Sequence, residues 1–257
     1  MIVAIARIIT LLTDFGTADG YVGEVKGVLL SGVPDATVVD ITHDIPAQDV
    51  DYARLVVARV WRRFPSGTIH IVVVDPGVGS SRAALAVEAD GRCLIGPDNG
   101  VLSPALLTAG ARAAQLGVPA GASATFHGRD VFAPAAVSLA TGARVDDLGP
   151  EMPSPIVRRT PEAIRLADGR VQGEVIAIDR FGNAITNIVG LRGGSLELEG
   201  TSLALRRIYA DVDVGEPIAV VGSSGFIEVA VRSGSAAAHF GLVRGAPVIF
   251  RALDTAE

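Results

Sequence analysis

Residues 71–82 read I-V-V-V-D-P-G-V-G-S-S-R, and the fold can be worked out from this stretch. Its first four residues are β-branched, which predicts a strand buried on both faces inside a parallel sheet. Asp75 ends the strand, a turn rich in glycine follows, and Arg82 comes seven positions after the acid. Ligands of open α/β sheets bind beyond the carboxyl ends of the strands, so Asp75 and Arg82 are candidate site residues. A structural interpretation, a buried acid that caps the turn and pairs with Arg82, is equally open.

Strands and helices alternate over residues 1–150. The apolar residues 1–12 are interpreted as a first strand, because the run is too short to span a bilayer and Arg7 interrupts it. The β-branched residues 8–13 end in T-D-F-G-T-A-D-G, which places Asp14 and Asp19 behind a strand. Further strands are predicted at 37–41, 83–88 and 92–96, and helices at 21–30, 49–64 and 131–139. This alternation predicts an N-terminal α/β layered domain with a largely parallel sheet.

Two details of this domain are predicted from local patterns. The helix over 49–64 is expected to face the core with its apolar side chains and to turn Arg54 outward. Asp98 or Asn99 of P-D-N-G is a candidate cap for a helix that begins near Ser103, and a chemical role for them is no better supported than this structural one.

The composition changes after residue 150. Four prolines stand among charged residues at positions 150–161, so residues 151–169 are interpreted as a linker. Short alternating segments follow at 171–178, 195–198, 217–221, 227–231 and 247–252, with turns between them. Residues 170–257 are therefore predicted to form a small antiparallel β-barrel or sandwich.

Charge and cysteine content narrow the function. The net charge of −6 argues against a general nucleic-acid binder, which usually clusters Lys and Arg against phosphates. No membrane-spanning segment is predicted either. The single cysteine, Cys93, has no partner for an internal disulfide and belongs to no zinc motif. These features are consistent with a reducing cytoplasm.

Four histidines are candidates for proton transfer. His70 in a strand and His239 beside an apolar turn are expected in core or surface roles, and His43 in T-H-D-I is expected to cap a turn. His127 differs, because T-F-H-G-R-D places it after Phe126 at the entry to a helix, where an imidazole can face a cleft. The chain contains no H-E-x-x-H, G-x-S-x-G or phosphate-loop motif. A divalent-metal site built on Asp14, Asp19 and Asp75 stays open.

The second half has its own polar cluster. A strand over 174–178 ends at Asp179, and a Phe-Gly turn leads to Asn183. An asparagine side chain offers both a donor and an acceptor, as reading the edge of an adenine requires, although a capping role fits equally well. The turn G-S-S-G at 222–225 is expected to expose two hydroxyl groups.

The motifs T-D-F-G-T-A-D-G, V-D-P-G-V-G-S-S-R, P-D-N-G, T-F-H-G-R-D and I-D-R-F-G-N-A-I-T-N-I stand in this order along nearly the whole chain. In order and spacing they resemble the S-adenosyl-L-methionine (SAM) hydroxide adenosyltransferase family, which includes fluorinating and chlorinating enzymes. The resemblance implies an N-terminal α/β domain and a C-terminal β-barrel. It also implies a homotrimer with active sites between neighbouring subunits, and hydrolysis of SAM to adenosine and L-methionine without a cofactor or metal.

The resemblance also implies that Asp75, Arg82 and His127 activate a water. The fluorinating relative carries tyrosine at the first and last of these positions, a serine at Gly128 and a long insertion, so water is favoured over halide. Substrate contacts are implied for the ribose, the adenine and the methionine; they comprise Asp14, Asp19, Phe126, Asp179, Phe181, Asn183, Tyr209, Ser223, Glu228 and Val231. Ser224 and Arg232 depart from the fluorinating pattern. The alternatives are a chloride-using halogenase, a SAM- or adenosine-binding protein without turnover, and a divalent-metal hydrolase.

Overall fold

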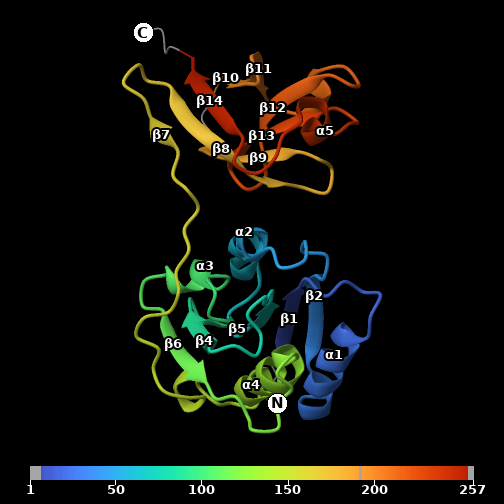
Figure 1. The fold of residues 1–257 in the computed structure, drawn as a ribbon, viewed down its shortest axis with the longest axis vertical. Coiled ribbons are helices and arrows are strands. Elements are labelled where there is room, and N and C mark those ends of the chain that lie inside the picture. The colour runs from blue at the N-terminus through green and yellow to red at the C-terminus, as the bar shows by residue number, and fades with distance from the viewer. Residues whose placement is uncertain (1–6, 191–192, 254–257) are drawn as a thin grey trace, which may run out of the picture. The chain divides into compact units, whose positions relative to one another are not determined.

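The computed structural model describes residues 7–190 and 193–253, which form two compact units dividing between Arg159 and Thr160 (Figure 1). Residues 1–6 of the predicted first strand lie outside the described residues. Residues 151–159 belong to the first unit, where Met152 and Ile156 donate backbone hydrogen bonds to Ala113 and Asp98. The limits of the linker at 151 and 169 stay a prediction.

The first unit is built on a six-stranded sheet in the order β2-β1-β3-β5-β4-β6. Its strands are β1 (Ile8–Thr13), β2 (Thr37–Thr42), β3 (Ile69–Val73), β4 (Ala84–Ala89), β5 (Arg92–Pro97) and β6 (Arg112–Leu116). The pairs β1–β2, β1–β3 and β3–β5 are parallel, whereas β4 runs antiparallel to β5 and β6. The predicted α/β layered domain with a largely parallel sheet is confirmed.

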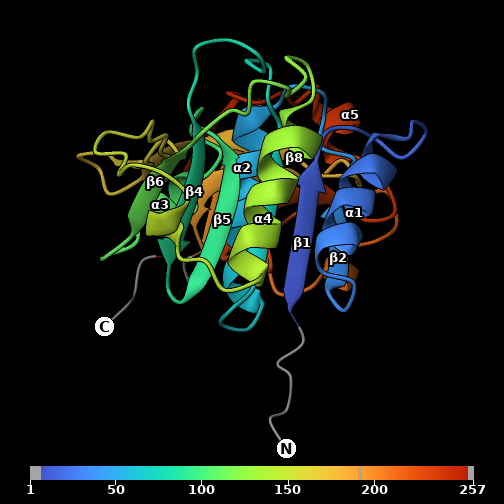
Figure 2. The ribbon, with the colours of Figure 1, turned by 90° about the horizontal axis from the view of Figure 1, so that it is seen from below.

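Helices cover both faces of this sheet (Figure 2). α1 (Tyr21–Gly32) and α4 (Ala133–Ala140) pack on one face, and α2 (Val50–Val60) and α3 (Ser103–Leu106) pack on the other. A π-helical turn, η2 (Gly128–Phe132), leads into α4, and 3-10 turns η1 (Trp61–Arg63) and η3 (Val145–Asp147) follow α2 and α4. Ile71 and Val73 join the core under α1 and α4, while Val72 and Val74 join the opposite core. The opening stretch is therefore buried on both faces, as predicted.

Two local predictions about this unit are wrong. Arg54 is not turned outward: it is 7% exposed, with its Nε 3.6 Å from Asp51 Oδ1. Its long aliphatic stem allows a charged residue to lie on the buried side of a helix, which a pattern of hydrophobic letters does not reveal. The helix at Ser103 has Leu102 as its N-cap and no side-chain cap. Asn99 instead donates to the carbonyl of Val74, at the end of β3, over 2.9 Å.

The second unit is a closed barrel. Its strands are β7 (Ile164–Arg165), β8 (Val171–Ile178), β9 (Ala184–Val189), β10 (Gly194–Leu198), β11 (Thr201–Arg206), β12 (Pro217–Val221), β13 (Phe226–Val231) and β14 (Pro247–Ala252). The pairing of β14 with β8 closes the order β14-β10-β11-β12-β13-β9-β8. The predicted β-barrel is confirmed, with one departure: β11 and β12 are parallel. Residues 207–216, which include the 3-10 turn η4 (Tyr209–Asp211), make the crossover that a parallel pair requires.

Candidate functional site

Asp75 and Arg82 form a buried ion pair at the carboxyl end of β3. Arg82 Nε donates to Asp75 Oδ1 over 2.9 Å, and Arg82 Nη2 donates to Asp75 Oδ2. The side chain of Asp75 is 5% exposed, and that of Arg82 is 9% exposed. A charge removed from water to this degree needs a partner, and the two-pronged contact fixes the plane of the guanidinium as well as its position.

The turn between these residues brings a second segment close. Gly79 has a φ of 77°, and a Cβ at this position would lie 2.3 Å from the carbonyl oxygen of Ala124. Only glycine permits both the left-handed backbone and this approach. The turn after Asp75 is thereby held against the segment that leads to His127.

His127 completes the arrangement. Its side chain is buried, and Arg82 Nη2 donates to His127 Nδ1 over 2.9 Å. Because a guanidinium only donates, Nδ1 accepts, and the proton of the neutral ring is assigned to Nε2. Burial and then the charge of Arg82 lower the pKa of His127 from its ordinary value of 6.5, against the opposing charges of Asp75 and Asp130. The imidazole is therefore held in the neutral form that a general base requires.

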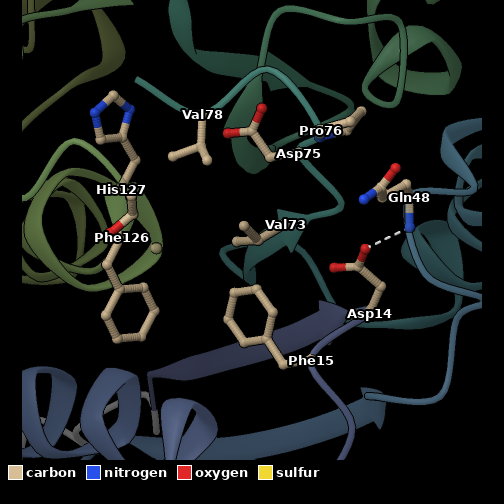
Figure 3. Close-up of a pocket in the computed structure, with 11 residues that line it drawn as sticks. Asp14, Phe15, Gln48, Val73, Asp75, Pro76, Val78, Phe126 and His127 are labelled. Atoms are coloured by element: carbon tan, nitrogen blue, oxygen red, sulfur yellow. Dashed lines mark hydrogen bonds between the residues drawn. The ribbon is translucent and has the colours of Figure 1, made fainter. Parts of the chain in front are cut away.

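Asp75 and His127 line a cavity of about 280 Å³, together with Asp14, Phe15, Gln48 and Phe126 (Figure 3). Asp14 follows β1, and its Oδ2 accepts the backbone N–H of Gln48 over 2.7 Å. Figure 3 shows the other carboxylate oxygen of Asp14 turned away from Gln48, toward the middle of the lining residues. The ends of β1 and β3 thus bring two carboxylates to one cavity, as the parallel sheet predicts. Asp19 is exposed and does not line this cavity.

Gln48 is a cavity residue that the sequence did not reveal. It has a φ of 66°, the left-handed region, which only a few per cent of residues other than glycine adopt. Its exposed side chain lines the cavity, while its N–H holds Asp14. Strained backbone of this kind gathers at functional sites. No sequence pattern marks a left-handed glutamine, although its place between Pro46 and the helix N-cap Asp49 indicates a turn.

Aromatic rings form one side of the cavity. Phe126 meets Phe15 and Tyr21 edge to face, with centroids 5.9 and 5.4 Å apart. Phe15 and Tyr21 also meet edge to face at 6.0 Å. Such pairs add about 0.5–1.5 kcal/mol each beyond the area they bury. Phe126 therefore has a defined position next to His127.

The other histidines have structural surroundings. His43 does not cap a turn as predicted: it is buried, and its Nδ1 lies 2.9 Å from Thr13 Oγ1. The Thr13 hydroxyl also accepts the N–H of Phe15, so this pair supports the loop that carries Asp14. His70 is a core residue as predicted, bonded to Thr10, and burial lowers its pKa to about 4. Burial raises the pKa of the Cys93 thiol to about 11, which makes it a poor nucleophile.

In the second unit, Asp179 organises the turn between β8 and β9. Its Oδ1 accepts the N–H groups of Phe181 and Asn183, each over 2.9 Å, and its Oδ2 accepts Asn183 Nδ2 over 3.0 Å. Asn183 is buried, whereas Phe181 is 76% exposed. The turn thus places a solvent-exposed aromatic ring, that of Phe181, close in sequence to Asn183, whose side-chain amide nitrogen already donates a hydrogen bond to Asp179.

Tyr209 and Glu228 lie near Asp179 in this unit. Burial, followed by the carboxylates of Glu228 and Asp179, raises the pKa of the Tyr209 phenol. Glu228 is 6% exposed, and a Cβ on Gly222 would lie only 1.8 Å from Glu228 Oε1. Gly222 is therefore the residue that gives this buried carboxylate its space.

The turn at 222–225 only partly matches the expectation of two exposed hydroxyl groups. Ser223 is exposed, but Ser224 Oγ is buried and has no hydrogen-bond partner among the described residues. Val231 is buried at the end of β13, and the Arg232 guanidinium donates to the carbonyl of Val212 over 2.7 Å.

The predicted carboxylates do not assemble a metal site. Within residues 7–190 and 193–253, no group of three or more His, Cys, Asp or Glu side chains is arranged to hold a metal ion. Asp75 uses both oxygens on Arg82, and Asp19 lies outside the cavity. None of the helices in the same ranges is long and apolar enough to cross a membrane.

Comparisons with known proteins agree with this architecture. Residues 9–149 match the model of the SAM hydroxide adenosyltransferase N-terminal domain, and residues 173–249 match that of its C-terminal domain. A Thermus thermophilus protein named (R)-S-adenosyl-L-methionine hydrolase is 43% identical over 94% of this chain and 98% of its own. A protein named Fluorinase from Actinopolyspora mzabensis is 29% identical over 94% and 96%.

A solved structure gives the same result for the fold. An uncharacterized conserved protein from Thermotoga maritima has a TM-score of 0.85 and 31% identity, covering 94% of this chain and 99% of its own. Together the two matched domains account for most of the chain, and their order is the order of the two units described above. The chain therefore belongs to the SAM hydroxide adenosyltransferase family.

Proposed function

We propose that this protein hydrolyses SAM to adenosine and L-methionine by attack of water on C5′ of the ribose. The observation that carries the proposal is the joined set of Asp75, Arg82 and His127 beside a cavity that also contains Asp14. The name of the Thermus thermophilus relative supports the same reaction. Methionine leaves the sulfonium as a neutral thioether, so its departure needs neither an acid nor a metal. The difficulty lies in the nucleophile, because water is weakly nucleophilic at neutral pH.

The three residues address that difficulty in a coupled step. His127 Nδ1 accepts a hydrogen bond from Arg82, so it takes a proton from water only as that bond breaks. The released guanidinium N–H then donates to the oxygen that is becoming hydroxide. Asp75 keeps the guanidinium in place while its partner changes. Proton transfer by a positioned base contributes about 10²–10⁴-fold, and electrostatic stabilisation of the developing charge adds to it.

The substrate contacts are proposed from the family resemblance and from each unit's own geometry. Asp14 offers its second oxygen to a ribose hydroxyl, with Asp19 nearby, and Phe126 forms the adjoining wall. Phe181 and Asn183 are assigned to contacts with the adenine, and Tyr209 and Val231 are assigned to the wall of the pocket around it. Asp179, Ser223 and Glu228 are assigned to the methionine portion.

Two wider features belong to the proposal. The active protein is a homotrimer in which neighbouring subunits share each active site, and it works in the cytoplasm. Sedimentation of the purified protein tests the trimer directly: a mass of one chain at assay concentration contradicts it. No cofactor is expected, so full activity in the presence of a chelator is a further expected result.

SAM exists as two epimers that differ in the configuration of the sulfonium sulfur, and an enzyme can discriminate between them. The curated relative is named for the (R) epimer, and we propose that this chain also prefers it. Such a preference would direct hydrolysis to one sulfonium configuration and leave the other intact. Incubation with each separate epimer tests this, and equal rates contradict the preference while leaving hydrolysis itself in place.

Incubation in ¹⁸O-labelled water is the primary test. One label is expected in the 5′-hydroxyl of adenosine, with an equal amount of methionine released. Absence of adenosine, or adenosine without label, contradicts the proposal. A parallel incubation with chloride distinguishes a halogenase, because 5′-chloro-5′-deoxyadenosine then replaces adenosine as the product.

A further inference from the structure

Arg129 lies two residues after His127 and ties this part of the chain to α1. Its Nε and Nη2 donate to the two carboxylate oxygens of Asp130 over 2.7 and 3.0 Å. Its Nη1 donates to Glu24 Oε2 on α1 over 2.7 Å. One guanidinium therefore joins the π-helical turn η2 to a helix more than 100 residues earlier in the chain.

The same guanidinium packs on a cavity residue. Its central carbon lies 4.9 Å from the centroid of the Phe126 ring. Asp130, which Arg129 fixes on one side, accepts the backbone N–H of Ser123 over 2.8 Å on the other. The contacts of Arg129 thus anchor the chain both before and after the Phe126–His127 pair.

The backbone on both sides of His127 is irregular. His127 directly precedes the π-helical turn η2, and residues 117–126 before it contain neither helix nor strand. π-helical turns are rare, occur mostly as single turns within α-helices, and are frequent at functional sites. The contacts of Arg129 and Asp130 on either side of this irregular backbone can therefore help to set the direction of His127, in addition to the hydrogen bond from Arg82.

We propose that Arg129 is a positioning residue, which holds Phe126 and His127 in the geometry that the proposed hydrolysis requires. The inference rests on the proposed function for its catalytic consequence. Arg129, Glu24 and Asp130 retain 34%, 46% and 21% of their side-chain exposure, and ion pairs this open to solvent add little to stability. Its removal should therefore disturb the geometry of the site much more than the melting temperature.

The chain contains a matched control for this test. Arg62 donates through Nε to Asp90 over 2.7 Å, and its guanidinium carbon lies 4.4 Å from the centroid of the Trp61 ring. Arg62 thus makes the same two kinds of contact as Arg129, but neither it nor Trp61 lines the cavity. A general loss from breaking a surface arginine–aromatic contact will appear in both variants.

The experiment compares R129Q and R62Q for SAM hydrolysis. R129Q is expected to lose about 10–100-fold in kcat, because displacement of a catalytic group by about 1 Å has consequences of this size. The change in KM should be smaller, and R62Q should keep the kcat of the unmodified protein. R129K, which keeps the charge without the planar fork, should recover part of the loss. Unchanged kcat in R129Q, or an equal loss in R62Q, overturns the proposal.

A second measurement needs neither substrate nor turnover. The chain has four histidines, so their ring signals can be followed by nuclear magnetic resonance, with H127Q identifying that of His127. The His127 signal should move in R129Q and in E24Q, which removes only the α1 anchor, but not in R62Q. A signal that stays in place in both variants overturns the positioning role. A moving signal in a protein that forms no adenosine keeps the positioning role and contradicts only the proposed hydrolysis.

Discussion

The polar cluster around Asp75 in the first unit and the one around Asp179 in the second differ in how far their side chains are buried and held by hydrogen bonds. In the first unit, Asp75 and Arg82 are less than 10% exposed and hydrogen-bonded to each other, and Arg82 is also hydrogen-bonded to His127. In the second unit, Phe181 is 76% exposed and Tyr209 is 45% exposed. The groups proposed for chemistry are thus fixed in advance, whereas two of the rings proposed for binding, those of Phe181 and Tyr209, are exposed to solvent. Substitutions should accordingly separate rate from affinity.

Replacement of His127 by alanine should have the largest effect. Loss of the proposed base is expected to lower kcat by about 10²–10⁴-fold, whereas the affinity for adenosine should change little. Product formation followed by chromatography, with calorimetric titration of adenosine, measures both quantities. H239A serves as the control, because His239 is exposed on the short helix α5 (Ala236–Phe240) of the second unit. A normal rate in H127A removes His127 from the mechanism.

Replacement of Phe181 by alanine tests the other side of the comparison. Stacking of a base on an aromatic ring contributes about 1–3 kcal/mol, so adenosine should bind about 5–150-fold more weakly. At saturating substrate kcat should be retained, and the melting temperature should not fall, because the ring is 76% exposed. V189A, at a 64% exposed position on β9, is the control. A fall in kcat with unchanged affinity would contradict the assignment of catalysis to the first cluster and of binding to the second.

The pH dependence of kcat/KM sharpens the picture of the first unit. A general base works when neutral, so activity is lost as the pH falls through its pKa. Burial and Arg82 lower the pKa of His127 from 6.5, so the acidic limb of the profile should lie below pH 6.5. Asp130 acts in the opposite direction, and D130N should therefore move this limb to still lower pH. A limb above 6.5 contradicts the base proposed here.

The strands, helices and turns could be predicted from the sequence because the patterns that indicate them involve only residues close together in the chain. The β-branched run of β3 and the turn at Asp90-Gly91 between β4 and β5 depend on neighbouring residues only. Contacts between distant residues were not readable from spacing: Arg82 meets His127 across 45 positions, and Thr13 meets His43 across 30. The family resemblance supplied the first of these pairs. The second is not implied by it, and the T-H-D-I pattern alone predicts a cap where the structure has a buried histidine.

Closure of the barrel was likewise implied by the resemblance rather than by the strand pattern alone. Short alternating segments fit a sandwich as well as a barrel. The pairing of β14 with β8, which decides between them, joins the two ends of the second unit. The parallel pair β11–β12 follows from the crossover at residues 207–216, and nothing in the two strands' own sequences indicates their relative direction.

Replacement of Gln48 by glycine should have the smallest effect, a change in KM for SAM, and Glu199 provides a matched control. Gln48 and Glu199 are both exposed and both have a positive φ, 66° and 44°. In Q48G and E199G the glycine relieves a strained backbone but also gains freedom in the unfolded chain, so both should change stability by no more than about 1 kcal/mol. Q48G keeps the N–H that holds Asp14, yet it loses a side chain that lines the cavity. KM for SAM should therefore rise a few-fold in Q48G alone. An unchanged KM would mean that position 48 acts only through its backbone, which would assign Gln48 to the preformed frame of the site and not to its binding surface.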